Sequence, residues 1–168
     1  SFIWQVEDID KVSASTVIRE VEEVVAKILS GQLGPVPRTL ALEGFHKLYD
    51  WHREVAMDNL RAADTKGLGD EALTGPSYGI AHKSIVRFLN KISASNVEYF
   101  VVTLWEAERK DDPKERSRNA PTHPGPLLPG QLEAAITGEF GVVMRSYLKR
   151  EGPLGAMRGM WQLMPKPG

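Results

Sequence analysis

The segment Arg38–Leu48, RTLALEGFHKL, decides how the chain is interpreted, together with a second segment of the same kind, Tyr99–Glu106, YFVVTLWE. Each contains an apolar run of strand length that passes into polar residues: Glu43 in the first segment, and Thr103 and Glu106 in the second. A stretch with a helical pattern precedes each run. Strands buried on both faces have continuous apolar sequences, and parallel strands are joined by crossover helices. The pattern therefore predicts two neighbouring parallel strands.

Ligands of parallel sheets bind just beyond the carboxyl ends of the strands. We therefore expect Glu43, Thr103 and Glu106 to lie along one edge of the sheet. The alternative is that both segments are buried helices, in which case the two glutamates and the threonine are only solvated helix ends.

Composition limits the class of protein. The chain has 168 residues, 42% of them hydrophobic and 26% charged, as in an ordinary soluble globular protein. A net charge of −1 excludes a strongly basic field over the whole chain. The absence of cysteine excludes disulfides, a thiolate nucleophile and a Cys-based zinc site. No apolar run approaches the roughly 20 residues that span a bilayer, so we expect no membrane partner. The length fits one domain over residues 1–168, and the absence of cysteine suits a cytoplasmic location.

Helical periodicity is clearest over Ser13–Leu29, where apolar residues recur on one face and Ser13 or Ser15 can cap the start. Further helices are predicted over about Phe45–Ala63 and Tyr78–Ile92, with a surface loop at residues 63–79 between them. The apolar face of the first helix consists of Val17, Ile18, Val21, Val24, Val25, Ile28 and Leu29.

Shorter elements are expected towards both ends. Phe2–Val6 has strand character, and Lys110–Gln131 is rich in proline and charge, which is typical of a mobile loop. A short helix, LEAAIT, is predicted after this loop. Gly141–Lys149 and Ala156–Met164 then predict two strands that form an antiparallel hairpin.

The order of these elements resembles the RecA-like P-loop ATPases, and is most similar to the AAA/RecA-type nucleotide-binding proteins of phage and bacterial recombination gene clusters. Thr39–Gly44 matches a strand that in the family ends in aspartate-serine, and Val101–Glu106 matches valine-valine-threonine-alanine-histidine-glutamate. Leu128–Gly130 matches a leucine-proline-glycine turn, and Arg158 matches an arginine near the last strand. The resemblance implies an α/β fold: a RecA-like, mostly parallel sheet flanked by helices, with a carboxyl-terminal antiparallel hairpin.

Three departures from that family stand out. The chain has no GxxxxGK[ST] loop to hold phosphates, and the nearest match, Gly79–Ser84, lacks the glycine before its lysine. In the family this loop precedes the first strand seen here, so we expect either the carboxyl-terminal part of such a domain or a degenerate member. Glu43 replaces an aspartate, which shifts the carboxylate relative to Mg²⁺, and Trp105 replaces a histidine.

The resemblance implies ATP and Mg²⁺ as cofactors. Glu43 would hold the water shell of Mg²⁺, Thr103 would contact the γ-phosphate or the attacking water, and Glu106 would act as general base. Arg158 would be an arginine finger that acts across a subunit boundary. Two further candidates for that role are Lys149 and Arg150. The alternative for Glu43 is a carboxylate that caps a turn, and for Thr103 an ordinary β-branched strand residue. The alternative for Glu106 is a solvated side chain, and for the three basic residues it is a charged hairpin surface.

The function implied is ATP-driven DNA recombination or remodelling by a homo-oligomer. DNA phosphates would meet basic residues of the loop, although interleaved acidic residues weaken their field. These basic residues are Lys110, Lys114, Arg116 and Arg118. His46 and His52 lie six positions apart, which does not fit two zinc ligands on one helix face. The alternatives are a non-catalytic module with this fold and an all-helical interaction or structural protein, such as a viral scaffold or coat.

Overall fold

The structure, a computed structural model, describes residues 3, 5, 11–110, 122–126, 140, 144–150 and 157–163. The chain forms two compact units, Ser1–Leu127 and Leu128–Gly168. A single domain over residues 1–168 stays a prediction, because compact units of one chain need not fold separately.

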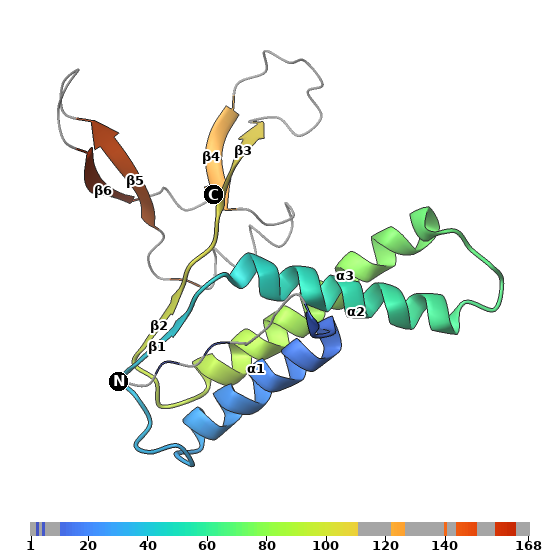
Figure 1. Cartoon of the computed structure of the whole chain (residues 1–168), viewed down its shortest axis with the longest axis horizontal. Helices are drawn as coiled ribbons and strands as arrows, with labels where there is room; N and C mark the ends of the chain where they lie inside the picture. Colours follow the sequence, from blue (N-terminus) through green and yellow to red (C-terminus); the bar gives the residue numbers. More distant parts are fainter. Residues whose placement is uncertain are drawn as a thin grey trace. The chain divides into compact units, whose positions relative to one another are not determined.

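The first unit contains three helices and four short strands within the described residues (Figure 1). In chain order these are α1 (Ala14–Leu29), β1 (Thr39–Leu42), α2 (Phe45–Ala63), α3 (Asp70–Ser93), β2 (Tyr99–Val102), β3 (Glu106–Lys110) and β4 (Thr122–Pro126). The described part of the second unit contains β5 (Met144–Arg150) and β6 (Met157–Leu163), which pair antiparallel where the sequence predicts a hairpin.

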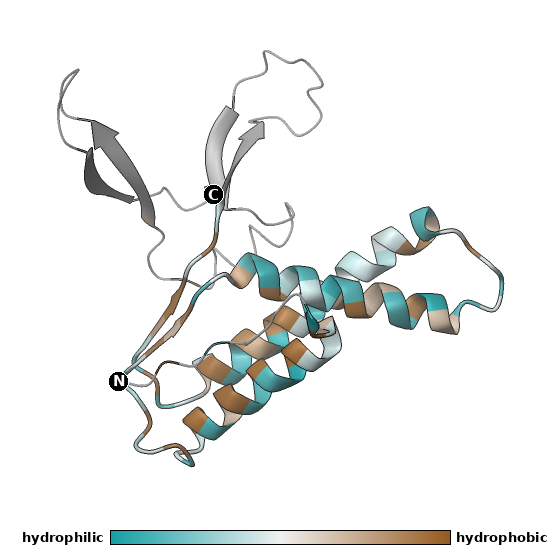
Figure 2. Cartoon of the chain, in the orientation of Figure 1, coloured by the Kyte–Doolittle hydropathy of each residue, from teal (hydrophilic) through white to brown (hydrophobic). Residues whose placement is uncertain are grey.

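The helices of the first unit supply its core. α1 begins where predicted, after Ser13, whose hydroxyl accepts a hydrogen bond from the Thr16 N–H at 3.4 Å. Its buried residues are Ala14, Val17 and Val21, and the two valines belong to the predicted apolar face. α2 packs against both α1 and α3. Hydrophobic residues lie along α1, the carboxyl-terminal half of α3, β1 and β2 (Figure 2). The buried apolar residues of α2 and α3 are Phe45, Leu48, Tyr49, Ala56, Leu73, Ala81, Ile85, Phe88, Leu89 and Ile92.

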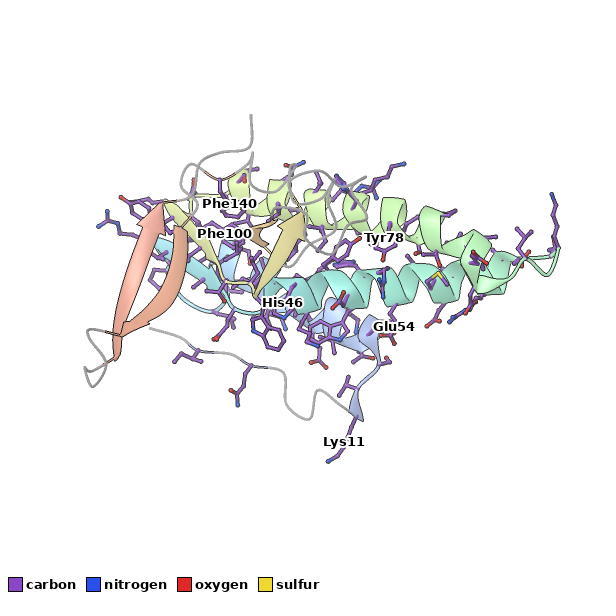
Figure 3. The ribbon with its side chains drawn as sticks, turned by 90° about the horizontal axis from the view of Figure 1, so that it is seen from above. Lys11, His46, Glu54, Tyr78, Phe100 and Phe140 are labelled. Carbon is purple, nitrogen blue, oxygen red and sulfur yellow. The ribbon has the colours of Figure 1, made fainter. Side chains whose placement is uncertain are left out.

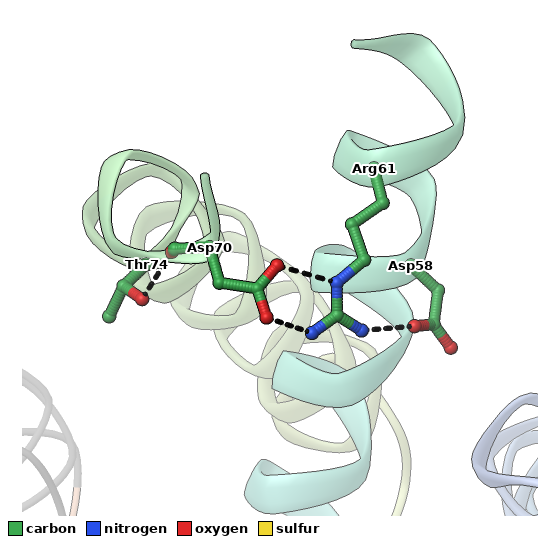
Figure 4. A network of polar contacts seen from close by, with 4 residues as sticks. All are labelled: Asp58, Arg61, Asp70 and Thr74. Atoms are coloured by element: carbon green, nitrogen blue, oxygen red, sulfur yellow. Dashed lines mark hydrogen bonds and ion pairs between the residues drawn. The ribbon is translucent and has the colours of Figure 1, made fainter. Parts of the chain in front are cut away.

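α3 begins at Asp70, so the prediction of a surface loop at residues 63–79 is wrong for its second half. Arg61, in the last turn of α2, donates to both carboxylate oxygens of Asp70, at 2.9 and 2.6 Å, and to Asp58 at 3.1 Å (Figure 4). Two acidic residues in the first turn also suit the positive end of the helix dipole. Gly75 and Pro76 suggest a loop, but the burial of Leu73 and Ser77 outweighs their weak helix propensity, and the exposed ion pair adds little to it.

β1 and β2 are neighbouring parallel strands, as the sequence predicts. Thr39 is in register with Tyr99 and Leu42 with Val102. The pairing continues past the strand end, where the Thr103 N–H donates to the Leu42 carbonyl at 2.9 Å. At the opposite end Arg38 and Glu98 form a two-pronged ion pair, with N–O distances of 2.9 and 2.7 Å. The alternative that these two segments are helices is therefore excluded.

The predicted fold class, a RecA-like and mostly parallel sheet flanked by helices, is wrong. In the part of the chain that the structure describes, the parallel sheet has two short strands, and helix predominates over strand in the first unit. The continuous apolar runs led to this error, because they indicated strands buried on both faces. In fact burial alternates along both strands, and Tyr99 and Val101 are 59% and 46% exposed. One face of the pair is therefore uncovered.

The segment Lys110–Gln131 is not entirely loop. Thr122–Pro126 forms β4, which pairs antiparallel with β3 from Glu106↔Pro126 to Lys110↔Thr122. Proline is tolerated in such a two-stranded sheet, because an edge strand has positions whose backbone N–H makes no hydrogen bond to the neighbouring strand. The rest of that loop, the LEAAIT helix and most of the Phe2–Val6 strand lie outside the described residues. Among the helices that are described, none combines the length and apolar character needed to cross a bilayer.

Candidate functional site

The edge where β1 ends is shaped by a single glycine. Glu43 follows Leu42 directly, and its side chain is exposed. Gly44 then takes a left-handed conformation, with φ 73° and ψ 35°, and α2 begins at Phe45. This conformation favours glycine, because a Cβ atom would approach the following carbonyl oxygen. The turn therefore places a carboxylate beside the amino end of a 19-residue helix.

Thr103, which follows β2, closes this edge. Its hydroxyl oxygen accepts a hydrogen bond from the Gly44 N–H at 3.2 Å, and its carbonyl accepts from the Phe45 N–H at 2.9 Å. These bonds satisfy two backbone donors that would otherwise be orphaned at the start of α2. The threonine hydroxyl keeps its own proton for another acceptor, since an O–H group donates once and accepts twice. Glu43 and Thr103 are thus brought to the same edge, as predicted.

A hollow of about 350 Å³, the strand-edge pocket, lies where the two strands end. Its apolar floor includes the half-buried Leu104, and Lys47 and Trp105 are both exposed. The first turn of α2 itself has no acidic residue, so Glu43, directly before the cap residue Gly44, is the one carboxylate among the pocket's described residues beside the positive end of the helix dipole. The residues that line the pocket are Glu43, Gly44, His46, Lys47, Thr103, Leu104 and Trp105. The pocket therefore combines one carboxylate with a surface that attracts anions.

His46, which is labelled in Figure 3, is one of the residues that line this pocket. It is 4% exposed, and its Nδ1 accepts a hydrogen bond from the backbone N–H of Trp105 at 3.4 Å. The two rings lie 4.7 Å apart between centroids at 33°. Burial lowers the pKa of His46, as does the neighbouring Lys47, and Asp50 opposes them. The imidazole is therefore neutral with its proton on Nε2, which has no hydrogen-bond partner among the residues that the structure describes.

The other predicted site residues are located by backbone only. Glu106 is the first residue of β3, three positions after Thr103, and Arg158 lies on β6 in the second unit. Lys149 and Arg150 end β5, and Lys110 ends β3. The structure does not describe the side chains of these residues, and Lys114, Arg116 and Arg118 lie outside it. Their catalytic and DNA-binding roles stay predictions.

Sequence reasoning missed the contributions of His46, Lys47 and Trp105. It considered His46 as a zinc ligand, and Trp105 as a departure from a family pattern and as a core or interface aromatic. The available signal was position: His46 and Lys47 lie in the first turn after Gly44, and Trp105 follows Thr103 by two residues. Within the described residues no group of three or more metal-binding side chains occurs.

A second hollow, of about 440 Å³, lies between α2 and α3. The two cationic side chains among its described residues are engaged within the protein: Arg53 donates to the hydroxyl of Tyr78, which is labelled in Figure 3, at 2.8 Å, and Arg61 pairs with Asp70. The strand-edge pocket is therefore the better candidate for a ligand. No family model matches the chain, and neither does any curated protein or solved structure. Its function has to be argued from its own residues.

Proposed function

We propose that the strand-edge pocket binds the phosphate groups of a nucleotide together with Mg²⁺, as the ATP-binding part of an ATPase. The observation that carries this proposal is the meeting of Glu43 and Thr103 where two parallel strands end, beside the amino end of α2. Ligand sites of parallel sheets lie at this position, and anions bind readily at the amino ends of helices.

The side chains suit this ligand. Mg²⁺ keeps several of its waters in proteins and is held through one or two carboxylates plus phosphate oxygens, so Glu43 alone is a sufficient protein ligand. Bound there, the ion would neutralise charge on the phosphates. The exposed Lys47 can pair with a phosphate, and the Thr103 hydroxyl still has a proton to donate to a phosphate oxygen.

The amino end of α2 is not a full phosphate cradle. The N–H groups of Phe45 and Lys47 already donate to the carbonyls of Thr103 and Gly44, at 2.9 and 2.8 Å. A phosphate would therefore meet the helix dipole, the lysine and the hydroxyl rather than a ring of N–H groups. Because the sequence also has no GxxxxGK[ST] loop, we expect weak binding by this chain. Hydrolysis, DNA and a homo-oligomer remain expectations based on the resemblance.

Thermal unfolding with and without Mg-ATP tests the proposal. A ligand that binds only the folded state stabilises it by about 2.7 kcal/mol at 100 times its Kd. We expect Mg-ATP to raise the Tm of the wild-type chain, and both Glu43→Gln and Lys47→Gln to reduce that rise. Glu71→Gln is the matched control, because Glu71 is an exposed carboxylate on α3 outside the pocket.

The outcomes separate the candidate functions. No rise in Tm at millimolar Mg-ATP, or an equal rise in wild type and Glu43→Gln, would refute the proposed site. A rise without release of inorganic phosphate would favour the alternative of a non-catalytic binding module. A rise with phosphate release that Glu43→Gln abolishes would support the ATPase.

A further inference from the structure

We propose that Trp105 stacks on the base of the nucleotide that the strand-edge pocket binds. This inference rests on the proposed function. It adds a second contact, between the protein and the base, that contributes to affinity in addition to the phosphate contacts. It also assigns a binding role to a residue that sequence reasoning interpreted as a departure from a family pattern or as a core or interface aromatic.

The indole of Trp105 is unusually placed for a tryptophan. It is 65% exposed, although tryptophan is among the residues that are most buried on average. Its ring nevertheless has a defined neighbour, the His46 ring, at 4.7 Å between centroids, and the backbone N–H of Trp105 donates to His46 Nδ1, which fixes the main chain beside that ring. An exposed aromatic ring in a fixed position loses little conformational entropy when a planar ligand stacks on it. The position therefore favours a binding role over a packing role.

The two faces of the indole differ. His46 lies against one side, and the exposed area shows that much of the remaining surface is open to solvent. Trp105 also lines the same hollow as Glu43, Lys47 and Thr103, the residues proposed to meet the phosphates. A nucleotide with its phosphates at the amino end of α2 can therefore place its base near the indole.

Stacking of this kind tolerates different bases, because every base has a π-face. Within the described residues the pocket presents one carboxylate, one lysine and one threonine hydroxyl, all assigned to the phosphate end. We therefore expect adenine and guanine nucleotides to bind with similar affinity. Tripolyphosphate, which has no base, should bind about tenfold or more weakly, corresponding to about 1.4 kcal/mol or more.

Isothermal titration of the full chain with Mg-ATP, Mg-GTP and Mg-tripolyphosphate tests this proposal. Trp105→Leu should weaken ATP and GTP binding about tenfold and leave tripolyphosphate binding unchanged. Trp105→Phe keeps an aromatic face and should retain most of the difference between ATP and tripolyphosphate. Trp51→Phe, a half-buried tryptophan of α2 outside the pocket, is the matched control. A cooperative thermal unfolding transition of each variant checks that it folds.

Failure of this inference differs from failure of the proposed function. If ATP and tripolyphosphate bind the wild-type chain equally, or if Trp105→Leu weakens both to the same extent, stacking is refuted and the phosphate site stands. If neither ligand binds, the phosphate site is refuted, and the stacking proposal is refuted with it.

Discussion

His52 should make the stability of this protein depend on pH. It lies on α2, is 8% exposed, and its Nε2 has no hydrogen-bond partner among the residues that the structure describes. Burial lowers its pKa, against the opposing effect of the nearby Glu22 carboxylate on α1. The folded protein therefore resists protonation of this ring at a pH where the unfolded chain accepts the proton.

The sign and size of the effect follow from proton linkage. A histidine in the unfolded chain titrates near 6.5, so the stabilisation due to neutral His52 is complete above that pH. It is lost as the pH falls from about 6.5 towards the lower pKa of the folded state. The slope cannot exceed about 1.4 kcal/mol per pH unit for each histidine. At about 3 °C per kcal/mol for a chain of this size, the limit is about 4 °C per pH unit.

Thermal melts of wild type and His52→Phe at pH 7.5, 6.5 and 5.5 measure this effect. Phenylalanine fills a similar volume without a charge, so the variant should lose less stability on acidification and melt above wild type at pH 5.5. His46 has a pKa lowered by burial as well, so part of the pH dependence should persist in the variant. His82→Gln, at a half-buried position on α3, is the control. If His52→Phe and wild type lose Tm equally between pH 7.5 and 5.5, the reasoning is wrong.

Three further predictions concern stability. Gly44→Ala should lower the free energy of unfolding in urea by about 1 kcal/mol, because Gly44 has a left-handed backbone, although an added Cβ would meet no atom within 4 Å. Gly75→Ala, where an added Cβ also meets open space but the backbone is helical, should instead raise it by about 1 kcal/mol. Equal effects of the two substitutions would contradict the left-handed conformation assigned to Gly44. Thr103→Val should cost about 1 kcal/mol through loss of the bond from the Gly44 N–H, and Thr103→Ser should restore it. Asp70→Asn should speed hydrogen exchange of the amides in the first turn of α3, because Asp70 loses its ion pair with Arg61. The Tm should hardly change, since that ion pair is exposed. Unchanged amide exchange would show that the ion pair does not stabilise the first turn.

The sequence predicts the local structure of the first unit well. The apolar period of α1, the bounds of α2 and the parallel pairing of β1 with β2 follow from patterns of apolar residues and from Ser13. The number of strands in a sheet is a different kind of property. An apolar strand such as Leu40–Leu42 has the same sequence pattern whether one of its faces is covered or both. The pattern of apolar residues alone therefore favoured a larger sheet than the described residues form.

The candidate site was predictable in part for a similar reason. Glu43 and Thr103 were found because strand ends in a parallel pair meet at one edge. The role of His46 depends on the packing of its ring against Trp105, a contact between residues 59 positions apart. Such contacts depend on tertiary structure, which leaves no periodic signal in the sequence. The start of α3 was missed because Gly75 and Pro76 favour a loop, whereas tertiary burial of Leu73 and Ser77 favours the helix.

The pairing of Arg38 with Glu98 joins positions 60 residues apart, and α2 and α3 make up most of the chain between them. Closing so long a loop is entropically unfavourable until the helical hairpin has shortened the distance. The two strands that form the strand-edge pocket should therefore pair late in folding. A chain stalled before that step would have native helices and no assembled pocket, so circular dichroism alone would not reveal a misfolded preparation.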